Sequence, residues 1–168
     1  MNRKLLLPLL IGALALLLSA CSVDIARNSD GSLTAAATMG LADLESELEG
    51  AFSYHNTQVR NVDVSAQGGA LAVTMERERA AQPGTFDTLS YLMTPGIEDG
   101  GLVITLSDVL VNGQPADPEK VSEWQERITE RLAGRRENRP NATLQSVSVT
   151  EDGLEMVYRI EARRSQGG

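Results

Sequence analysis

Residues 102–132 read LVITLSDVLVNGQPADPEKVSEWQERITERL, a strand pattern, a turn and a helix pattern in direct succession. Leu102, Ile104 and Leu106 alternate with smaller or polar residues, which is the period of a strand. Beyond the Ser107-Asp108 pair, apolar residues occupy both parities up to the Asn-Gly turn at 112–113. This change predicts a bend or bulge in the strand, or burial of both of its faces.

The second half of this stretch carries the signals of a helix. Asp117 suits the N-cap and Pro118 the first helical position, and an acid follows in the first turn. One face is marked by apolar residues at i, i+3, i+7 and i+11: Val121, Trp124, Ile128 and Leu132. Gly134 then provides a stop. We expect an amphipathic helix that packs this face on a sheet.

The flanking sequence predicts one more helix and further strands. Leucines at helical spacing predict an amphipathic helix over 34–53. Alternating patterns separated by Gly-rich or Pro-Gly turns predict strands at 61–66, 71–79, 86–93, 144–150 and 154–163. Because nearly all strand connections are short, the sheet should be mainly antiparallel. The predicted fold class is α+β: two amphipathic helices packed on a strongly curved, mainly antiparallel sheet of about six strands.

The first residues have the organisation of an export signal. Arg3 and Lys4 precede an apolar run over 5–18, which is short for a membrane-spanning helix. The run ends in Leu-Ser-Ala-Cys at 18–21, which resembles the lipobox of bacterial lipoproteins. Cys21 is the single cysteine of the chain. An ordinary secretory signal with an unrelated cysteine, or an uncleaved anchor helix, would give a similar pattern.

The lipobox resemblance implies that Cys21 is diacylated and becomes the first residue of the mature protein. The chain then divides into a signal peptide (1–20), the lipidated cysteine with a polar tether (21–32), one α+β domain (33–163) and a polar tail (164–168). This implies an extracytoplasmic protein anchored to a membrane by its lipid. The membrane is the outer membrane or the outer face of the cell membrane, depending on the type of envelope.

Composition excludes several classes of function. Cleavage before Cys21 would remove Arg3 and Lys4 and no acid, so the mature chain would carry 13 basic and 23 acidic residues. Such an acidic protein is a poor candidate for nucleic-acid binding. His55 is the single histidine, and no nucleophile–base pair or phosphate-binding motif is present. We predict no enzymatic activity, no cofactor and no metal site.

Four segments in order carry a resemblance to a family. They are LTAAATMGLADLESELEGAF (33–52), VRNVDVSAQGGALAVTMERE (59–78), TPGIEDGGLVITLSDVLVNGQPADPEKVSEWQERITERL (94–132) and LQSVSVTEDGLEMVYRIEA (144–162). Their order is similar to that of small bacterial members of the tubular lipid-binding (TULIP-like) superfamily, in particular LmeA-like lipoproteins. The resemblance is one of pattern and includes no signature motif.

This resemblance implies a half-barrel wrapped around a helix, with an elongated apolar groove that binds or carries a lipid without covalent chemistry. The candidate groove-lining residues are Leu106, Leu110, Trp124, Ile128, Met156 and Tyr158. The same side chains could instead form a closed core. The protein would then be an envelope lipoprotein that binds a protein partner or acts as a scaffold, with an exposed apolar patch. Both interpretations remain open at this point.

Overall fold

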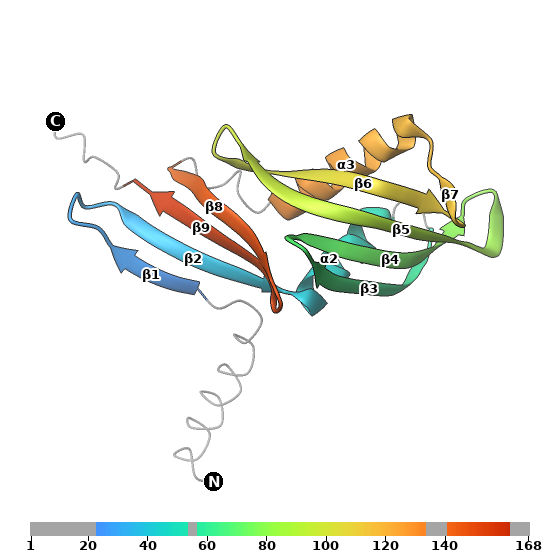
Figure 1. Cartoon of the computed structure of the whole chain (residues 1–168), viewed down its shortest axis with the longest axis horizontal. Coiled ribbons are helices and arrows are strands. Elements are labelled where there is room, and N and C mark those ends of the chain that lie inside the picture. Colours follow the sequence, from blue (N-terminus) through green and yellow to red (C-terminus); the bar gives the residue numbers. More distant parts are fainter. Residues whose placement is uncertain (1–22, 54–56, 134–140, 162–168) are drawn as a thin grey trace, which may run out of the picture.

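The computed structural model describes residues 23–53, 57–133 and 141–161. Over these residues the protein is α+β, with two helices and nine strands arranged in two antiparallel sheets (Figure 1). The fold class is therefore confirmed. The expected single sheet of about six strands is wrong, because the chain forms a four-stranded and a five-stranded sheet.

The four-stranded sheet joins the beginning and the end of the chain. Its order is β1 (Val23–Arg27), β2 (Leu33–Gly40), β9 (Gly153–Ile160) and β8 (Ala142–Thr150). β2 pairs with β9 in an unbroken register from Leu33↔Ile160 to Gly40↔Gly153. The central pair of this sheet is thus made by segments that lie more than a hundred residues apart in sequence.

The five-stranded sheet is a meander of consecutive strands. It contains β3 (Val59–Gln67), β4 (Ala70–Arg79), β5 (Gln82–Glu98), β6 (Gly101–Val111) and the short β7 (Gln114–Pro115). Both helices, α2 (Leu41–Phe52) and α3 (Pro118–Ala133), lie against this sheet, and the four-stranded sheet extends beyond them (Figure 1). Short connections explain the antiparallel order.

α3 begins as its sequence predicts. The Glu119 amide donates a hydrogen bond of 2.9 Å to the Asp117 carboxylate, which confirms the N-cap. Trp124, Ile128 and Leu132 are buried against the sheet. Side chains of the helix also bond to backbone amides of β6 that no strand of the described chain pairs. The Ile104 amide donates to Thr129 Oγ1 at 3.2 Å, and the Leu106 amide donates to Gln125 Oε1 at 3.0 Å. The expected stop at Gly134 lies outside the described residues.

Two expectations for the N-terminal region are wrong. The helix predicted over 34–53 begins only at Leu41, and its first part is strand β2. The polar tether predicted over 21–32 is, in its described part, strand β1 followed by a turn. Ala35, Ala36 and Ala37 favour helix by intrinsic propensity, but pairing with β9 on one side and β1 on the other overrides it.

The change predicted near Ser107-Asp108 is a β-bulge. Asp108 has a φ of 51°, and the register of β5 with β6 shifts between Ser90 and Leu92. Leu102, Ile104 and Leu106 are buried before the bulge, and Val109 is buried after it. The extra residue therefore reverses the parity of the strand, so that Leu110 no longer shares a face with Leu106.

One hydrophobic cluster spans both sheets. It contains Leu44 and Leu48 of α2, residues of β3 to β6, the buried face of α3, and Leu144, Leu154 and Met156 of the four-stranded sheet. The two sheets also share a hydrogen bond of 2.9 Å from the Leu144 amide to the Gly100 carbonyl oxygen.

Gly153 is the position where the β8–β9 turn meets the end of β2. Its φ is 140°, and a Cβ there would overlap the carbonyl oxygen of Met39. We predict that Gly153→Ala lowers the free energy of unfolding by roughly 3 kcal/mol or more, because strain and backbone overlap add.

The matched control is Gly68→Ala. Gly68 also has a positive φ, 58°, but a Cβ there would meet nothing within 4 Å. It should therefore lose only about 1–2 kcal/mol, the cost of the left-handed backbone. Urea unfolding of both variants measures the difference. Equal losses would show that overlap of the new Cβ with the Met39 carbonyl oxygen does not contribute to the destabilisation.

Candidate functional site

The six predicted groove residues do not lie together along one groove. Leu106, Trp124, Ile128 and Met156 are buried in the hydrophobic cluster, and Tyr158 is half-buried and packs against it. Leu110 lies beyond the bulge and pairs with Pro115 of β7. Two members of the set, Met156 and Tyr158, share one face of the four-stranded sheet.

Trp124 is the best defined of these residues. Its side chain is 4% exposed, and its ring meets the Phe52 ring edge-on at a centroid distance of 5.7 Å. Phe52 also contacts Tyr91, at 6.2 Å. The Tyr91 hydroxyl has no hydrogen-bond partner among the described residues, and burial raises the pKa of this phenol. These rings form the packed centre between α2, α3 and β5.

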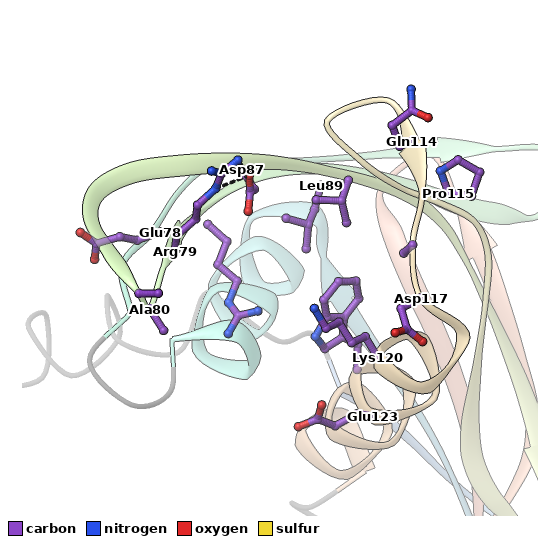
Figure 2. Close-up of a pocket in the computed structure, with 15 residues that line it drawn as sticks. Glu78, Arg79, Ala80, Asp87, Leu89, Gln114, Pro115, Asp117, Lys120 and Glu123 are labelled. Atoms are coloured by element: carbon purple, nitrogen blue, oxygen red, sulfur yellow. Dashed lines mark hydrogen bonds and ion pairs between the residues drawn. The ribbon is translucent and has the colours of Figure 1, made fainter.

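An open cavity of about 530 Å³ lies next to Trp124, between the β4–β5 hairpin and the start of α3 (Figure 2). Leu89, Val111 and Ala116 contribute apolar surface, together with the indole of Trp124. Its rim carries charges of both signs: Arg77, Arg79 and Lys120, and Glu78, Asp87, Asp117 and Glu123. Sequence reasoning missed this cavity because its residues come from separate elements.

Contacts within the protein already engage several of the rim charges. Arg79 forms an ion pair of 2.6 Å with Asp87, and this contact holds the pKa of the Asp87 carboxyl below its ordinary value. Glu78 accepts a hydrogen bond of 2.6 Å from the Gly84 amide, and Glu123 pairs with Arg127. A cavity bordered by four carboxylates is a poor site for an alkyl chain, since these groups must remain hydrated.

The four-stranded sheet has one apolar and one polar face. Paired residues of neighbouring strands lie on the same face, so the register defines complete rows. The apolar rows are Val23–Ala37–Met156–Val147, Ile25–Ala35–Tyr158–Leu144 and Arg27–Leu33–Ile160–Ala142, with Arg27 as their one charged residue. The opposite rows are small or polar except for Val157: Asp24–Ala36–Val157–Ser146 and Ala26–Thr34–Arg159–Thr143.

Part of this apolar face is not covered. Leu144 and Met156 are buried, whereas Leu33, Ala37, Tyr158 and Ile160 are only half-buried. On β1, the side chain of Val23 is 54% exposed and that of Ile25 is 65% exposed. We call Val23, Ile25, Leu33, Ala37, Tyr158 and Ile160 the open face. The strands that carry it extend past both helices (Figure 1).

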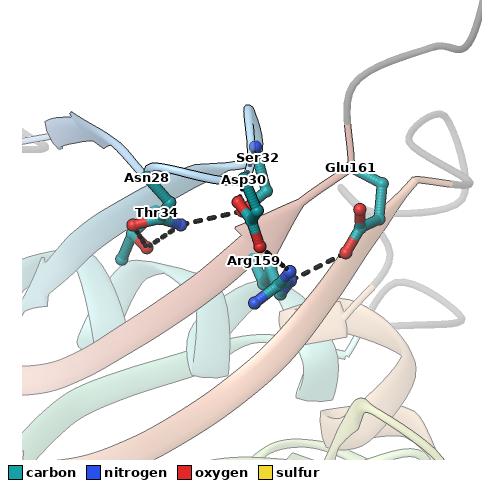
Figure 3. A network of polar contacts seen from close by, with 6 residues as sticks. All are labelled: Asn28, Asp30, Ser32, Thr34, Arg159 and Glu161. Carbon is teal, nitrogen blue, oxygen red and sulfur yellow. Dashed lines mark hydrogen bonds and ion pairs between the residues drawn. The ribbon is translucent and has the colours of Figure 1, made fainter.

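A polar network holds the β1–β2 turn in place (Figure 3). Asp30 accepts hydrogen bonds from the Ser32 amide at 3.0 Å and the Ser32 hydroxyl at 2.7 Å, and it pairs with Arg159 of β9 at 2.5 Å. Asn28 Nδ2 donates to Thr34 Oγ1 at 3.0 Å. β1 is therefore attached to the sheet by its turn as well as by its ladder, and its apolar side chains have a defined position.

The remaining candidate groups are a metal cluster, His55 and Cys21. Within 23–53, 57–133 and 141–161, no cluster of His, Cys, Asp and Glu has the geometry to hold a metal ion. His55 and Cys21 lie outside the described residues. The open face and the cavity beside Trp124 are thus two features of the described structure that could receive a ligand. A second open cavity, of about 420 Å³, lies between β6 and α3 and has a largely polar lining that includes Glu98, Glu126 and Glu130.

Comparisons of the chain with protein-family models, curated proteins and solved structures found no match. The functional argument therefore rests on the side chains and their arrangement.

We predict that Asp30→Asn destabilises the protein in a pH-dependent manner. Hydrogen bonds from Ser32 and the contact with Arg159 lower the pKa of the Asp30 carboxyl from 3.8 to about 2. The ionised carboxylate therefore stabilises the folded state at pH values above 3.8, and this contribution is lost as the pH falls toward 2.

The difference in unfolding free energy between the parent and Asp30→Asn should accordingly be largest at neutral pH and approach zero near pH 2. Urea unfolding of the detergent-solubilised chain across this range measures it. A difference that does not change with pH would show that the charge of Asp30 is not what holds the turn.

Proposed function

We propose that this protein is a lipid-anchored, extracytoplasmic lipoprotein that binds a lipid or another hydrophobic ligand on the open face, without covalent chemistry. The observation that carries the proposal is the exposure of this face. Its apolar residues lie in rows across four hydrogen-bonded strands, and those toward β1 are only partly covered by protein. Contiguous exposed apolar surface of this kind is typical of ligand or interaction sites.

The chemistry of the open face suits an alkyl chain. Leu33, Ala37 and Ile160 offer apolar contact without a carboxylate among them, and Tyr158 adds a ring with a polar tip. Met156, beside them in the covered part of the face, is unbranched and can adapt to different ligand shapes. The cavity beside Trp124 is the less suitable site because its rim carries many charged groups.

The TULIP-like architecture belongs to this proposal. Two antiparallel sheets, two helices and the absence of a closed barrel over the described residues are compatible with a half-barrel that presents an apolar surface. The anchor is likewise proposed from Leu-Ser-Ala-Cys at 18–21. No helix in the described ranges is long and apolar enough to cross a membrane.

A protein partner is the second candidate ligand, and strand β1 favours it. Within the described chain β1 pairs only with β2, so one side of its backbone is available for another strand. The edge at β3 is different, since Asn61 interrupts its register with β4 at a bulge. In this alternative the protein is an envelope scaffold, and the exposed part of the open face is its partner surface.

The lipid proposal predicts that affinity depends on chain length. Each buried methylene contributes up to about 0.8 kcal/mol, so each added methylene should lower the Kd of a fluorescent fatty-acyl probe up to about fourfold until the face is filled. Fluorescence titration of the detergent-free protein with probes of increasing length measures this. Affinity that does not change with chain length would contradict the proposal.

Ala37→Glu and Ala36→Glu form a matched pair for locating the probe. The two alanines are neighbours on β2 and both are half-buried, but Ala37 lies in an apolar row and Ala36 in a polar row. Ala37→Glu should weaken probe binding at least about tenfold, since a carboxylate would have to lose water. Ala36→Glu should leave it unchanged. Equal effects of the two variants would show that the probe does not bind on this face.

The anchor is tested separately by Cys21→Ser. Without the thiol there is no atom to acylate, so the variant should be released from membranes or remain as an uncleaved precursor. Fractionation with mass spectrometry of the N-terminal peptide distinguishes these forms. A Cys21→Ser protein that is still cleaved and still membrane-bound would show that Leu-Ser-Ala-Cys is not a lipobox here.

A further inference from the structure

The two most exposed large apolar side chains of the described structure lie next to the proposed anchor. Val23 and Ile25 are 54% and 65% exposed and point to the same side of β1, because they are two residues apart on a strand. They continue the open face to the edge of the sheet. Asp24, between them in sequence, lies on the opposite face with Ala36.

The length of chain before β1 limits where these side chains can be. At most about 7 Å of extended backbone separates the Cα atoms of Cys21 and Val23, since each residue spans about 3.5 Å. If the acyl chains of Cys21 enter the bilayer, Val23 must lie in or on the headgroup layer, which is roughly 5–8 Å thick on each side. The polar network of the turn and the backbone pairing with β2 hold β1 in a fixed position on the sheet.

We propose that the β1 end of the open face docks on the surface of the bilayer that holds the anchor, with Val23 and Ile25 inserted at the interface. The proposal rests on lipidation of Cys21. Apolar contact must drive the docking, because the chain as a whole is acidic and gains little from anionic lipid. Arg27 is the one cation on this face and is exposed at the far end of β1, where it can meet a lipid phosphate.

This arrangement also deepens the proposed function. Leu33 of β2 lies beside β1, and Tyr158 and Ile160 of β9 come next across the sheet on the same face. A lipid leaving the bilayer would therefore pass from Val23 and Ile25 onto a continuous apolar surface without crossing a polar row. A second copy of the chain or a partner strand could occupy β1 instead. Either would cover the side chain at position 25 with protein and not with lipid.

Ile25→Trp and Asp24→Trp provide a test with a matched control. The full-length lipidated chain of each variant is reconstituted into phosphatidylcholine vesicles with brominated acyl chains, which quench an indole on contact. Both positions are exposed and lie on opposite faces, and Asp24 is one residue nearer to the anchor than Ile25. The native Trp124 is 4% exposed and also emits. Its emission is measured in the parent protein and subtracted from that of each variant.

The indole introduced by Ile25→Trp should be blue-shifted and lose most of its emission to the brominated lipid. The indole introduced by Asp24→Trp should emit at long wavelength and be quenched by aqueous iodide instead. Equal quenching of both, or of neither, overturns the docking. A blue-shifted Ile25→Trp indole that neither quencher reaches also overturns it, and shows that protein covers β1.

The failure of the anchor would look different. If the parent protein does not float with vesicles and its N-terminal peptide carries no acyl group, the lipidation and the docking fail together. If the parent protein floats but Ile25→Trp is not quenched, the docking alone fails. The acyl-probe titration is independent of both results, since it is carried out without a bilayer.

Discussion

The pairing of β2 with β9 is the constraint on which the rest of the structure depends. It brings residues 33–40 against residues 153–160 in one unbroken register, and it joins the N-terminal and C-terminal parts of the described chain. At its end, Gly40 and Gly153 allow the backbones to meet, and the Leu41 amide donates to the Asp152 carbonyl oxygen at 3.2 Å as α2 begins. A slip of one residue would transfer every apolar row to the polar side.

This register also explains why one sheet has two different surroundings. Near Gly153, Leu154 and Met156 join the cluster formed with α2 and α3. Farther along the same strands, Tyr158 and Ile160 are only half-buried. The apolar pattern continues along the strand although less of it is covered by protein. Contiguous apolar surface past the edge of the core is typical of ligand or interaction sites, and this is the physical basis of the proposed ligand and membrane sites.

Elements with strong local signals could be predicted from the sequence. The α3 helix has a cap, a proline and a regular apolar face, and β9 alternates without interruption after the β8–β9 turn, whereas β8 has a bulge between Leu144 and Ser146. β1 and β2 could not be predicted in this way. The alanines and threonines of β2 are too small to give a clear period, and its strand conformation depends on distant β9. β1 is only five residues long and depends in turn on β2.

The candidate site was only partly predictable for the same reason. Met156 and Tyr158 lie in regular alternation and were placed on an apolar face, whereas Leu110 required knowledge of the Asp108 bulge. Val23 and Ile25 stand among polar residues directly after the lipobox-like motif, where a tether is the usual interpretation. Only the pairing of β1 shows that the two side chains share a face. An anchor followed by a flexible tether lets a domain move away from the membrane, but an anchor followed at once by a strand holds that strand at the surface. A strand held at the bilayer surface is stabilised there by exposed apolar side chains, and Val23 and Ile25 of β1 are side chains of this kind.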